Sequence, residues 1–329
     1  MKFKLTLFLF LSLTIEIFSQ DIHFSQFWEP SAFVNPTQIG NFDGDLKITA
    51  HYRNQWSQFN TPITSMFGDV TYKLNKENQY WAFSLSMLRD QQSNLSYHQL
   101  RMAGSVSYQK RFSKVVLGGL GFQVGTRLTS IDYNKLTYNA QWDPISGQFL
   151  QSNPSYENFS AKDVYTPYLA MGTSVNIQKK KVLHTIDFAA MYVSENKRTD
   201  FVFYQPFKLT FNYHNYYTIT NKVTLMPKLG FITTASANSV NSGLLVKVNL
   251  SEYNDLYAGM LYRWGIDRNG DALIPVVGCK LKKLRVGFSY DYVTSGLNQE
   301  GHKSAYEVSA SYIFKSAKHK YFSIDCLRL

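Results

Sequence analysis

Polar connectors that alternate between short and long divide this chain into strand-like runs, and this rhythm constrains the fold more than any other feature. The runs begin near Leu46 and recur to Phe314. Short connectors lie at 75–79, 110–113, 179–181, 220–222, 252–255 and 280–283. Longer connectors lie at 54–65, 89–97, 129–163, 194–205, 233–242, 265–271 and 294–303. Outer-membrane barrels have short periplasmic turns, longer external loops and an even number of strands. Six short and seven long connectors make thirteen, which predicts an all-β fold: a 14-stranded antiparallel transmembrane β-barrel with both ends in the periplasm.

Side chains of two kinds alternate along these runs, as they do in strands with two different faces. In residues 285–292, apolar or aromatic side chains occupy every second position: Val286, Phe288, Tyr290 and Tyr292. Residues 48–53, 101–109 and 208–214 show the same period. Lipid requires an apolar outer face, whereas the inner face tolerates charge. A soluble β-sandwich also alternates, but the aromatic share of 16% suits the aromatic girdles of a barrel.

Two terminal segments and one pre-barrel segment lie outside the predicted wall of residues 46–314. Residues 1–20 have the charged start and apolar stretch of a signal peptide. Residues 21–45 are too rich in apolar rings to stay in water, so we expect them to pack in the lumen as a plug. The candidate plug residues are Phe24, Phe27, Trp28 and Phe33. Residues 315–329 are expected to form a C-terminal periplasmic tail.

The formal charge of +11 falls to +10 when residues 1–20, with Lys2, Lys4 and Glu16, are removed. An excess of positive charge can indicate a protein that binds nucleic acid, but a secreted barrel does not encounter nucleic acid. We assign the excess positive charge to lysine-rich periplasmic turns and to Arg and Lys side chains in the lumen. The turns would lie beside the head groups of outer-membrane lipid. Cys279 and Cys326 are too few for a disulfide framework, and the sequence leaves their pairing open.

No recognisable catalytic, metal or cofactor motif occurs in the sequence, which predicts a protein that is not an enzyme. None of the seven histidines pairs with another at a metal-ligand spacing. A barrel phospholipase needs adjacent Ser and His on the lipid face, and no such pair can be placed. The glycines of 118–125 resemble a nucleotide fingerprint but lie within a strand. We interpret them as permitting strand coiling or close packing against the plug.

Several motifs, spread over nearly the whole mature chain, occur together in one order. They are Asp21-Ile-His-Phe-Ser-Gln26, Asn35-Pro36, Gly40, His51-Tyr-Arg-Asn-Gln-Trp56, Ile131-Asp132, Gln141-Trp142-Asp143, Leu256-Tyr-Ala-Gly259, Arg263 and Leu284–Tyr292. In these motifs the chain resembles the PorP/SprF family, outer-membrane proteins of the type IX secretion system of Bacteroidota. One departure is Ala305-Tyr306-Glu307-Val308, where that family commonly has a Ser-His-Glu-Ile-like sequence. The departure argues against a chemical role for a histidine there.

The resemblance implies a non-enzymatic role: helping cargo with a C-terminal sorting domain, such as an adhesin, reach or stay on the cell surface. It also implies other type IX secretion components as partners and, in some relatives, a part in gliding motility. The alternative is a channel or small-molecule uptake barrel, which an open lumen would favour.

Two sets of polar and aromatic residues are candidates for function. The candidate partner contacts, at the end of the first strand and in the long loop 129–163, are Arg53, Asn54, Trp56, Trp142, Phe149 and Tyr156. Each has a structural alternative, as an interfacial girdle residue or as part of a packed lid. The candidate lumen network is Arg263, Arg285, Asp291 and Glu307. We expect the network to be structural.

Overall fold

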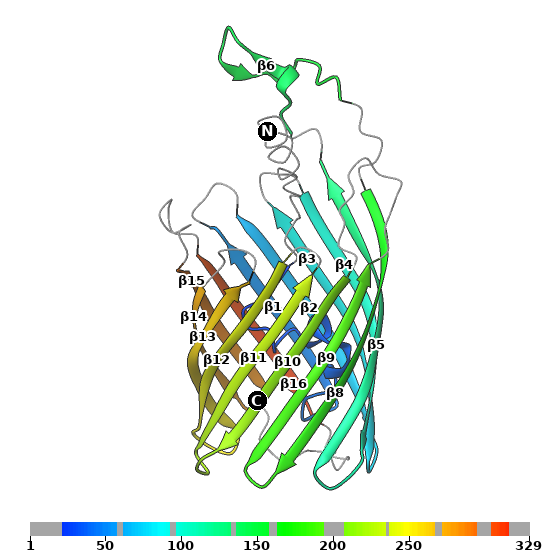
Figure 1. Cartoon of the computed structure of the whole chain (residues 1–329), viewed down its shortest axis with the longest axis vertical. Helices are drawn as coiled ribbons and strands as arrows, with labels where there is room; N and C mark the ends of the chain where they lie inside the picture. Colours follow the sequence, from blue (N-terminus) through cyan, green and yellow to red (C-terminus); the bar gives the residue numbers. More distant parts are fainter. Residues whose placement is uncertain are drawn as a thin grey trace, which may run out of the picture.

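A closed β-barrel of fourteen antiparallel strands makes up most of the molecule in the computed structural model (Figure 1). The structure describes residues 22–57, 62–92, 97–132, 136–157, 163–193, 207–234, 237–266, 272–294 and 304–315. The expectations for the signal peptide and for the tail beyond Lys315 lie outside these residues. Among the described residues, no helix is both long and apolar enough to cross a membrane.

The elements follow one another in the order in which they pair. The wall is formed by β1 (Leu46–Gln55), β2 (Ile63–Asn75), β3 (Gln79–Gln92), β4 (Tyr97–Arg111), β5 (Val116–Ile131), β8 (Asp163–Lys179), β9 (Val182–Val193), β10 (Phe207–Thr218), β11 (Val223–Thr234), β12 (Ala237–Asn249), β13 (Asn254–Gly265), β14 (Ala272–Leu281), β15 (Leu284–Val293) and β16 (Ala305–Phe314). The smaller elements are α2 (Ser31–Val34), η1 (Pro36–Gln38), η3 (Asn139–Gln141), β6 (Trp142–Asp143) and β7 (Gln148–Phe149).

Each wall strand pairs with the next one along the chain, and β5 pairs with β8 past the small β6–β7 hairpin. The first and last strands close the barrel in a continuous register from Leu46 opposite Phe314 to Gln55 opposite Ala305. The predicted strand number, the first and last strand residues and the closure are therefore confirmed. Closure leaves no free edge in the wall, since every strand of the wall has two neighbours.

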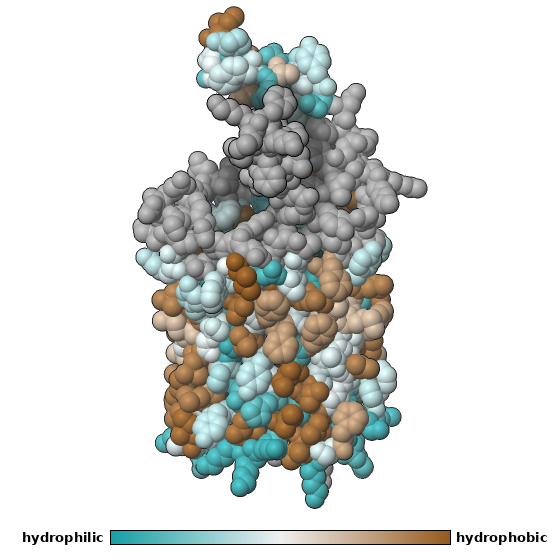
Figure 2. All heavy atoms as spheres, in the orientation of Figure 1, coloured by the Kyte–Doolittle hydropathy of each residue, from teal (hydrophilic) through white to brown (hydrophobic). Residues whose placement is uncertain are grey.

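The two faces of the wall differ as the alternation predicts. Outward-facing apolar side chains are exposed, among them Leu85, Leu120 and Met171 at 74%, 67% and 64%. Inward-facing neighbours such as Gln123 and Ser174 are buried although they are polar. Figure 2 shows apolar side chains over the wall and hydrophilic ones gathered at the short-turn end. Strands are stable in a lipid bilayer only when their outer face is apolar and their backbone groups are hydrogen-bonded to neighbouring strands. The wall meets both conditions.

One predicted connector is wrong. Residues 233–242 were expected to form a long loop, but β11 continues to Thr234 and β12 begins at Ala237. The residues of this stretch are small and polar, which is typical of a loop. The lumen face of a strand accepts such residues as well. Asn241, for example, is buried at 2% exposure on the inner side of β12. Polarity alone therefore does not mark a loop in this barrel.

Residues 22–45 contact inward-facing side chains on opposite sides of the wall and are drawn in blue between the strands in Figure 1. Asn35 begins η1 by accepting a hydrogen bond from Thr37 N at 2.9 Å, and Pro36 fills the first helical position. Gln123 Nε2 donates to Ala32 O at 2.9 Å. The short helical turns are thus tied to the wall by side chains of the lumen face.

Glycines of the wall leave room for this segment. A Cβ on Gly121 would collide with the backbone of Pro36 and Thr37, and one on Gly172 would collide with the Asn35 side chain. The sequence-based interpretation of close packing is confirmed at Gly121. Larger residues at these two positions would push η1 off the wall.

Candidate functional site

A compact ion-pair network lies in the lumen near the long-loop ends of β1, β13, β15 and β16. Arg53 contacts Glu307 at 2.5 Å and Asp291 at 3.0 Å. Arg263 contacts Asp291 at 2.8 Å, and His51 Nε2 lies 3.1 Å from Glu307. The side chains of Arg53, Asp291 and Glu307 are 3% exposed or less. Two guanidinium groups thus face two carboxylates in a site from which water is largely excluded.

The N-terminal segment completes this network. The backbone N–H groups of Ser25 and Gln26 donate to Glu307 at 2.6 and 2.9 Å. The Ser25 hydroxyl donates to Asp291 at 2.7 Å and accepts from Arg263 at 3.0 Å. Buried charges are stable only when they are paired and when their remaining lone pairs are hydrogen-bonded. Residues 25 and 26 supply these bonds, so the network binds the segment to the wall.

Three of the four residues predicted to form the lumen network do so. Arg263, Asp291 and Glu307 come together, whereas Arg285 lies near the short-turn end of the same strand as Asp291, and its Nε has no hydrogen-bond partner among the described residues. Sequence reasoning missed His51 as a member. Its signal was available, because alternation puts His51 and Arg53 on the inner face of β1 and closure sets Arg53 opposite Glu307.

Aromatic rings of the N-terminal segment lie against lysine and histidine side chains of the wall. Lys208 Nζ is 4.3 Å from the centre of the Phe33 ring, and Lys228 Nζ is 5.5 Å from that of Trp28. Phe24 packs on the His51 ring with centroids 4.4 Å apart. Phe27 stacks on His214 at 5.5 Å. The two lysine contacts are cation–π contacts, which contribute about 0.5–2 kcal/mol each. All four candidate plug residues therefore contact the wall.

The residues at the end of β1 separate into two groups. Arg53 was expected among the partner contacts, but it points into the lumen and is 2% exposed, because position 53 falls on the inner face. This placement is at odds with a contact on the external rim. Asn54 faces outward and donates to Tyr52 Oη at 3.2 Å. Trp56 N donates to Ser304 O at 2.9 Å, and Trp56 has a φ of 60°.

The β6–β7 hairpin, in the longest connector, stands beyond the strand ends in Figure 1. Trp142 and Phe149 face each other edge to face with centroids 5.0 Å apart, and each remains about half exposed. Ile145 at the tip is 96% exposed, and Tyr156 is 84% exposed. Hydrogen bonds from the Ser146 side chain and from the backbone N–H of Ile145 and Ser146 lower the pKa of the Asp143 carboxyl. The hairpin therefore presents apolar side chains on an ordered turn.

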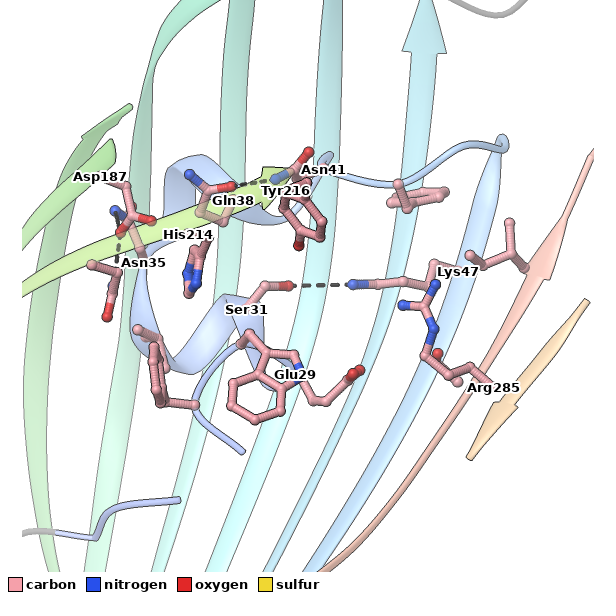
Figure 3. A pocket seen from close by; sticks show the side chains of 17 residues that line it. Glu29, Ser31, Asn35, Gln38, Asn41, Lys47, Asp187, His214, Tyr216 and Arg285 are labelled. Carbon is pink, nitrogen blue, oxygen red and sulfur yellow. Dashed lines mark hydrogen bonds between the residues drawn. The ribbon is translucent and has the colours of Figure 1, made fainter. Parts of the chain in front are cut away.

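A cavity of about 80 Å³ lies between the N-terminal segment and the wall (Figure 3). Its labelled side chains come from the segment, from β9 and β10, and from β1 and β15 on the other side. The polar residues that line it are Glu29, Ser31, Asn35, Gln38, Asn41, Lys47, Asp187, Asn212, His214, Tyr216, Arg285 and Ser311. Ser31 accepts a hydrogen bond from Lys47 Nζ at 3.3 Å. Among the described residues, no group of three or more His, Cys, Asp and Glu side chains could hold a metal ion.

A closed barrel with an apolar outside, a polar lumen and long connectors at one end defines an outer-membrane β-barrel protein. The family model for "Type IX secretion system membrane protein PorP/SprF" matches residues 17–312. The chain belongs to this family, and membership implies that it works with other components of the secretion system. No protein of curated function matches the sequence.

Solved structures with the same fold are outer-membrane barrels of very different sequence. A Pseudomonas aeruginosa FadL homologue has a TM-score of 0.51 at 10% identity, covering 86% of this chain and 94% of that one. The Pseudomonas putida toluene transporter TodX has a TM-score of 0.53 at 8% identity, covering 87% and 94%. The CymD monoaromatic hydrocarbon channel has a TM-score of 0.52 at 9% identity, covering 88% and 93%. At such identities the likeness concerns the fold alone.

Proposed function

We propose that this barrel helps cargo carrying a C-terminal sorting domain, such as an adhesin, to leave the cell or to stay attached to its surface. Family membership supports a role in type IX secretion. The observation that carries the proposal is the β6–β7 hairpin, which exposes Trp142, Ile145 and Phe149 on the long-loop side. Exposed aromatic side chains on a rigid turn are typical of protein-binding surfaces.

In this proposal residues 22–45 are a plug that stabilises the lumen, and the hairpin holds the partner. Apolar docking of the ring pair supplies affinity, because burying each ring removes a large apolar area from water. No strand edge of the wall is free for a partner strand, so pairing with the sheet is not the mode of contact. Asn54, Trp56 and Tyr156 are secondary contacts in the same proposal.

The experiment uses a gene-deletion strain complemented with variant barrels. Trp142→Ser together with Phe149→Ser should lower the amount of protease-accessible cargo on intact cells to that of the deletion strain. The matched control is Tyr253→Ser, which removes a ring of 59% exposure from a turn at the opposite end. Affinity purification of both variants from outer membrane then identifies the lost partner. Normal cargo display in the deletion strain itself contradicts the proposal.

A channel for small molecules is the second candidate, and the fold shared with hydrocarbon channels favours it. Against it stand the contacts that residues 22–45 make on both sides of the lumen. Conductance in planar bilayers separates the two candidates, because a channel shows a steady open level.

A further inference from the structure

Three neighbouring turns at the short-turn end carry only positive charge. They join β4 to β5, β8 to β9 and β10 to β11, which are consecutive pairs of strands in the wall. No Asp or Glu occurs in residues 111–116, 179–181 and 219–223. Their charged side chains are Arg111, Lys114, Lys179, Lys180, Lys181 and Lys222. Two of the other short turns contain Glu77 and Glu252, so positive charge is concentrated on one part of the circumference.

A polar cluster faces outward between the last two of these turns. His184 Nδ1 lies 3.0 Å from Tyr213 Oη, and Asn215 Nδ2 donates to the same hydroxyl at 3.2 Å. His184 and Asn215 are directly opposite each other on β9 and β10. All three side chains are partly exposed, whereas the neighbouring Thr185 and His214 are buried on the lumen face. The alternation therefore puts this outward cluster on the side of the wall that contacts lipid.

The depth of the outward cluster matches the head-group layer of a bilayer. His184 lies two residues from the first residue of β9, which is about 7 Å along the strand. The head-group layer is about 5–7 Å thick on each side of the bilayer. Polar side chains that face hydrocarbon are costly, so deeper positions should be apolar. The outward side chains next to the cluster are apolar and 38–43% exposed: Val175, Ile186, Phe188 and Phe211.

The outward cluster and the lysines together present donors and positive charge, which suits a phosphate group. When Tyr213 Oη donates to His184 Nδ1, the ring hydrogen of His184 lies on Nε2 and points to other acceptors. Asn215 Nδ2 has a second hydrogen to donate. Lys179 faces outward two positions from Ile177, which lies opposite His184. Such diagonal neighbours are about 7–8 Å apart, within the reach of a lysine side chain.

A similar pair of residues at the long-loop end lacks these charges. Asn54 Nδ2 donates to Tyr52 Oη at 3.2 Å, and both side chains face outward. The residues that pair with 52–54 on the two neighbouring strands include no lysine. The hydrogen-bonded Tyr and Asn thus occur at both ends of the wall, but only the short-turn end combines them with histidine and several lysines.

The chemistry of the site selects a lipid with a negatively charged head group. Its phosphate would lie at the outward cluster and its acyl chains along the apolar side chains beside it. An acidic protein is less suitable, because the cluster lies on the lipid side of the wall and not on the turns. We propose that one anionic phospholipid of the periplasmic leaflet binds here, with its phosphate held by His184, Tyr213, Asn215, Lys179, Lys180 and Lys181.

The test is native mass spectrometry of the full chain with phosphatidylglycerol or phosphatidylcholine of the same acyl chains. The unaltered protein should retain one phosphatidylglycerol at least about tenfold more tightly than phosphatidylcholine, because only the former has a net negative charge. Lys179→Gln, Lys180→Gln and Lys181→Gln together should reduce this preference to below about twofold. Tyr213→Phe removes the hydroxyl at the centre of the cluster and should weaken phosphatidylglycerol binding about threefold or more.

The matched controls change the same residue types outside the site. Lys76→Gln, Lys282→Gln and Lys283→Gln together remove three lysines from other turns of the same end. Lys282 has a positive φ, as Lys180 has, so each triple variant changes one residue of left-handed backbone. Tyr52→Phe removes the corresponding hydroxyl at the long-loop end. Both controls should bind phosphatidylglycerol like the unaltered protein, and heat-modified mobility on gels should show that all variants are folded.

Three results would overturn the proposal. The first is an unaltered protein that binds phosphatidylglycerol no more tightly than phosphatidylcholine. The second is an equal loss of preference in the two triple lysine variants, which would indicate diffuse attraction to the whole short-turn end. The third is tighter binding of hexaglutamate than of phosphatidylglycerol, which would indicate an acidic protein as the partner of the turns.

Discussion

The carboxylate of Glu307 joins parts of the chain that are far apart in the sequence. It accepts hydrogen bonds from the backbone of Ser25 and Gln26 and contacts Arg53 and His51 on the first strand. The Glu307 side chain therefore holds the N-terminal segment on the wall and links β1 to β16 at the seam, where the first and last strands pair. This position retains the Glu of the Ser-His-Glu-Ile-like sequence, whereas Tyr306 beside it faces outward and packs near Tyr52.

Replacing Glu307 by Ala should lower the free energy of unfolding by about 3 kcal/mol, because a buried Arg53 and two backbone N–H groups lose their acceptor. Urea unfolding of the barrel in phospholipid vesicles, followed by tryptophan fluorescence, measures this change. Glu77→Ala, at an exposed turn, is the matched control and should leave the unfolding curve in place. A loss below about 0.5 kcal/mol for the Glu307 variant would contradict the role given to the network.

At Gly121 a single methyl group decides whether η1 can lie on the wall. Gly121→Ala should displace residues 36 and 37, because its Cβ would collide with their backbone. Backbone hydrogen exchange at Thr37 and Gln38, whose N–H groups donate to Asn35, should then speed up about tenfold or more, since local opening costs less free energy. Gly104→Ala is the matched control, because a Cβ there meets only Leu85 at 3.9 Å. Equal exchange of η1 in the two variants would refute the close packing inferred here. Mass spectrometry of exchanged peptides gives the measurement.

Among the elements, the seam between β1 and β16 closes the whole barrel. Ala50 and Ala310 are directly opposite each other and face outward. In a chain with Cys279 and Cys326 replaced by Ser, the pair Ala50→Cys and Ala310→Cys should form a disulfide on mild oxidation, because opposed strand residues have suitable Cα distances. Faster gel mobility of the oxidised, heat-denatured chain reports it.

The control for this seam is the pair Ala50→Cys and Ser311→Cys. Position 311 lies opposite Thr49 and points into the lumen, away from Ala50. This pair should remain reduced. Cross-linking of the control in preference to the opposed pair would show that the register is shifted by one residue, which exchanges the lipid and lumen faces of the strand.

For the whole molecule, the contacts that residues 22–45 make on both sides of the lumen predict low conductance. Residues 22–45 contact β4, β5 and β8 on one side and β15 and β16 on the other. In planar bilayers the unaltered barrel should show no steady open level, whereas Gly121→Ala combined with Glu307→Ala should open more often because the segment loses anchors on both sides. A steady open level in the unaltered protein would favour the channel candidate and weaken the partner-binding one.

The sequence by itself determined the architecture. Connector lengths and the two-residue period predicted fourteen strands from Leu46 to Phe314, although the connector at 233–242 was wrong. They also predicted which side chains face lipid or lumen in residues 48–53, 101–109, 208–214 and 285–292, because both properties are local. The tertiary structure alone decided which inward residues meet. Closure brings Arg53 against Glu307 across more than 250 positions, and the height of each residue in the lumen separates Arg285 from Asp291 on one strand. Strand register and the path of residues 22–45 set these contacts. Alternation fixes the face of each residue, but a shift of two residues between neighbouring strands keeps both faces and changes every cross-strand partner.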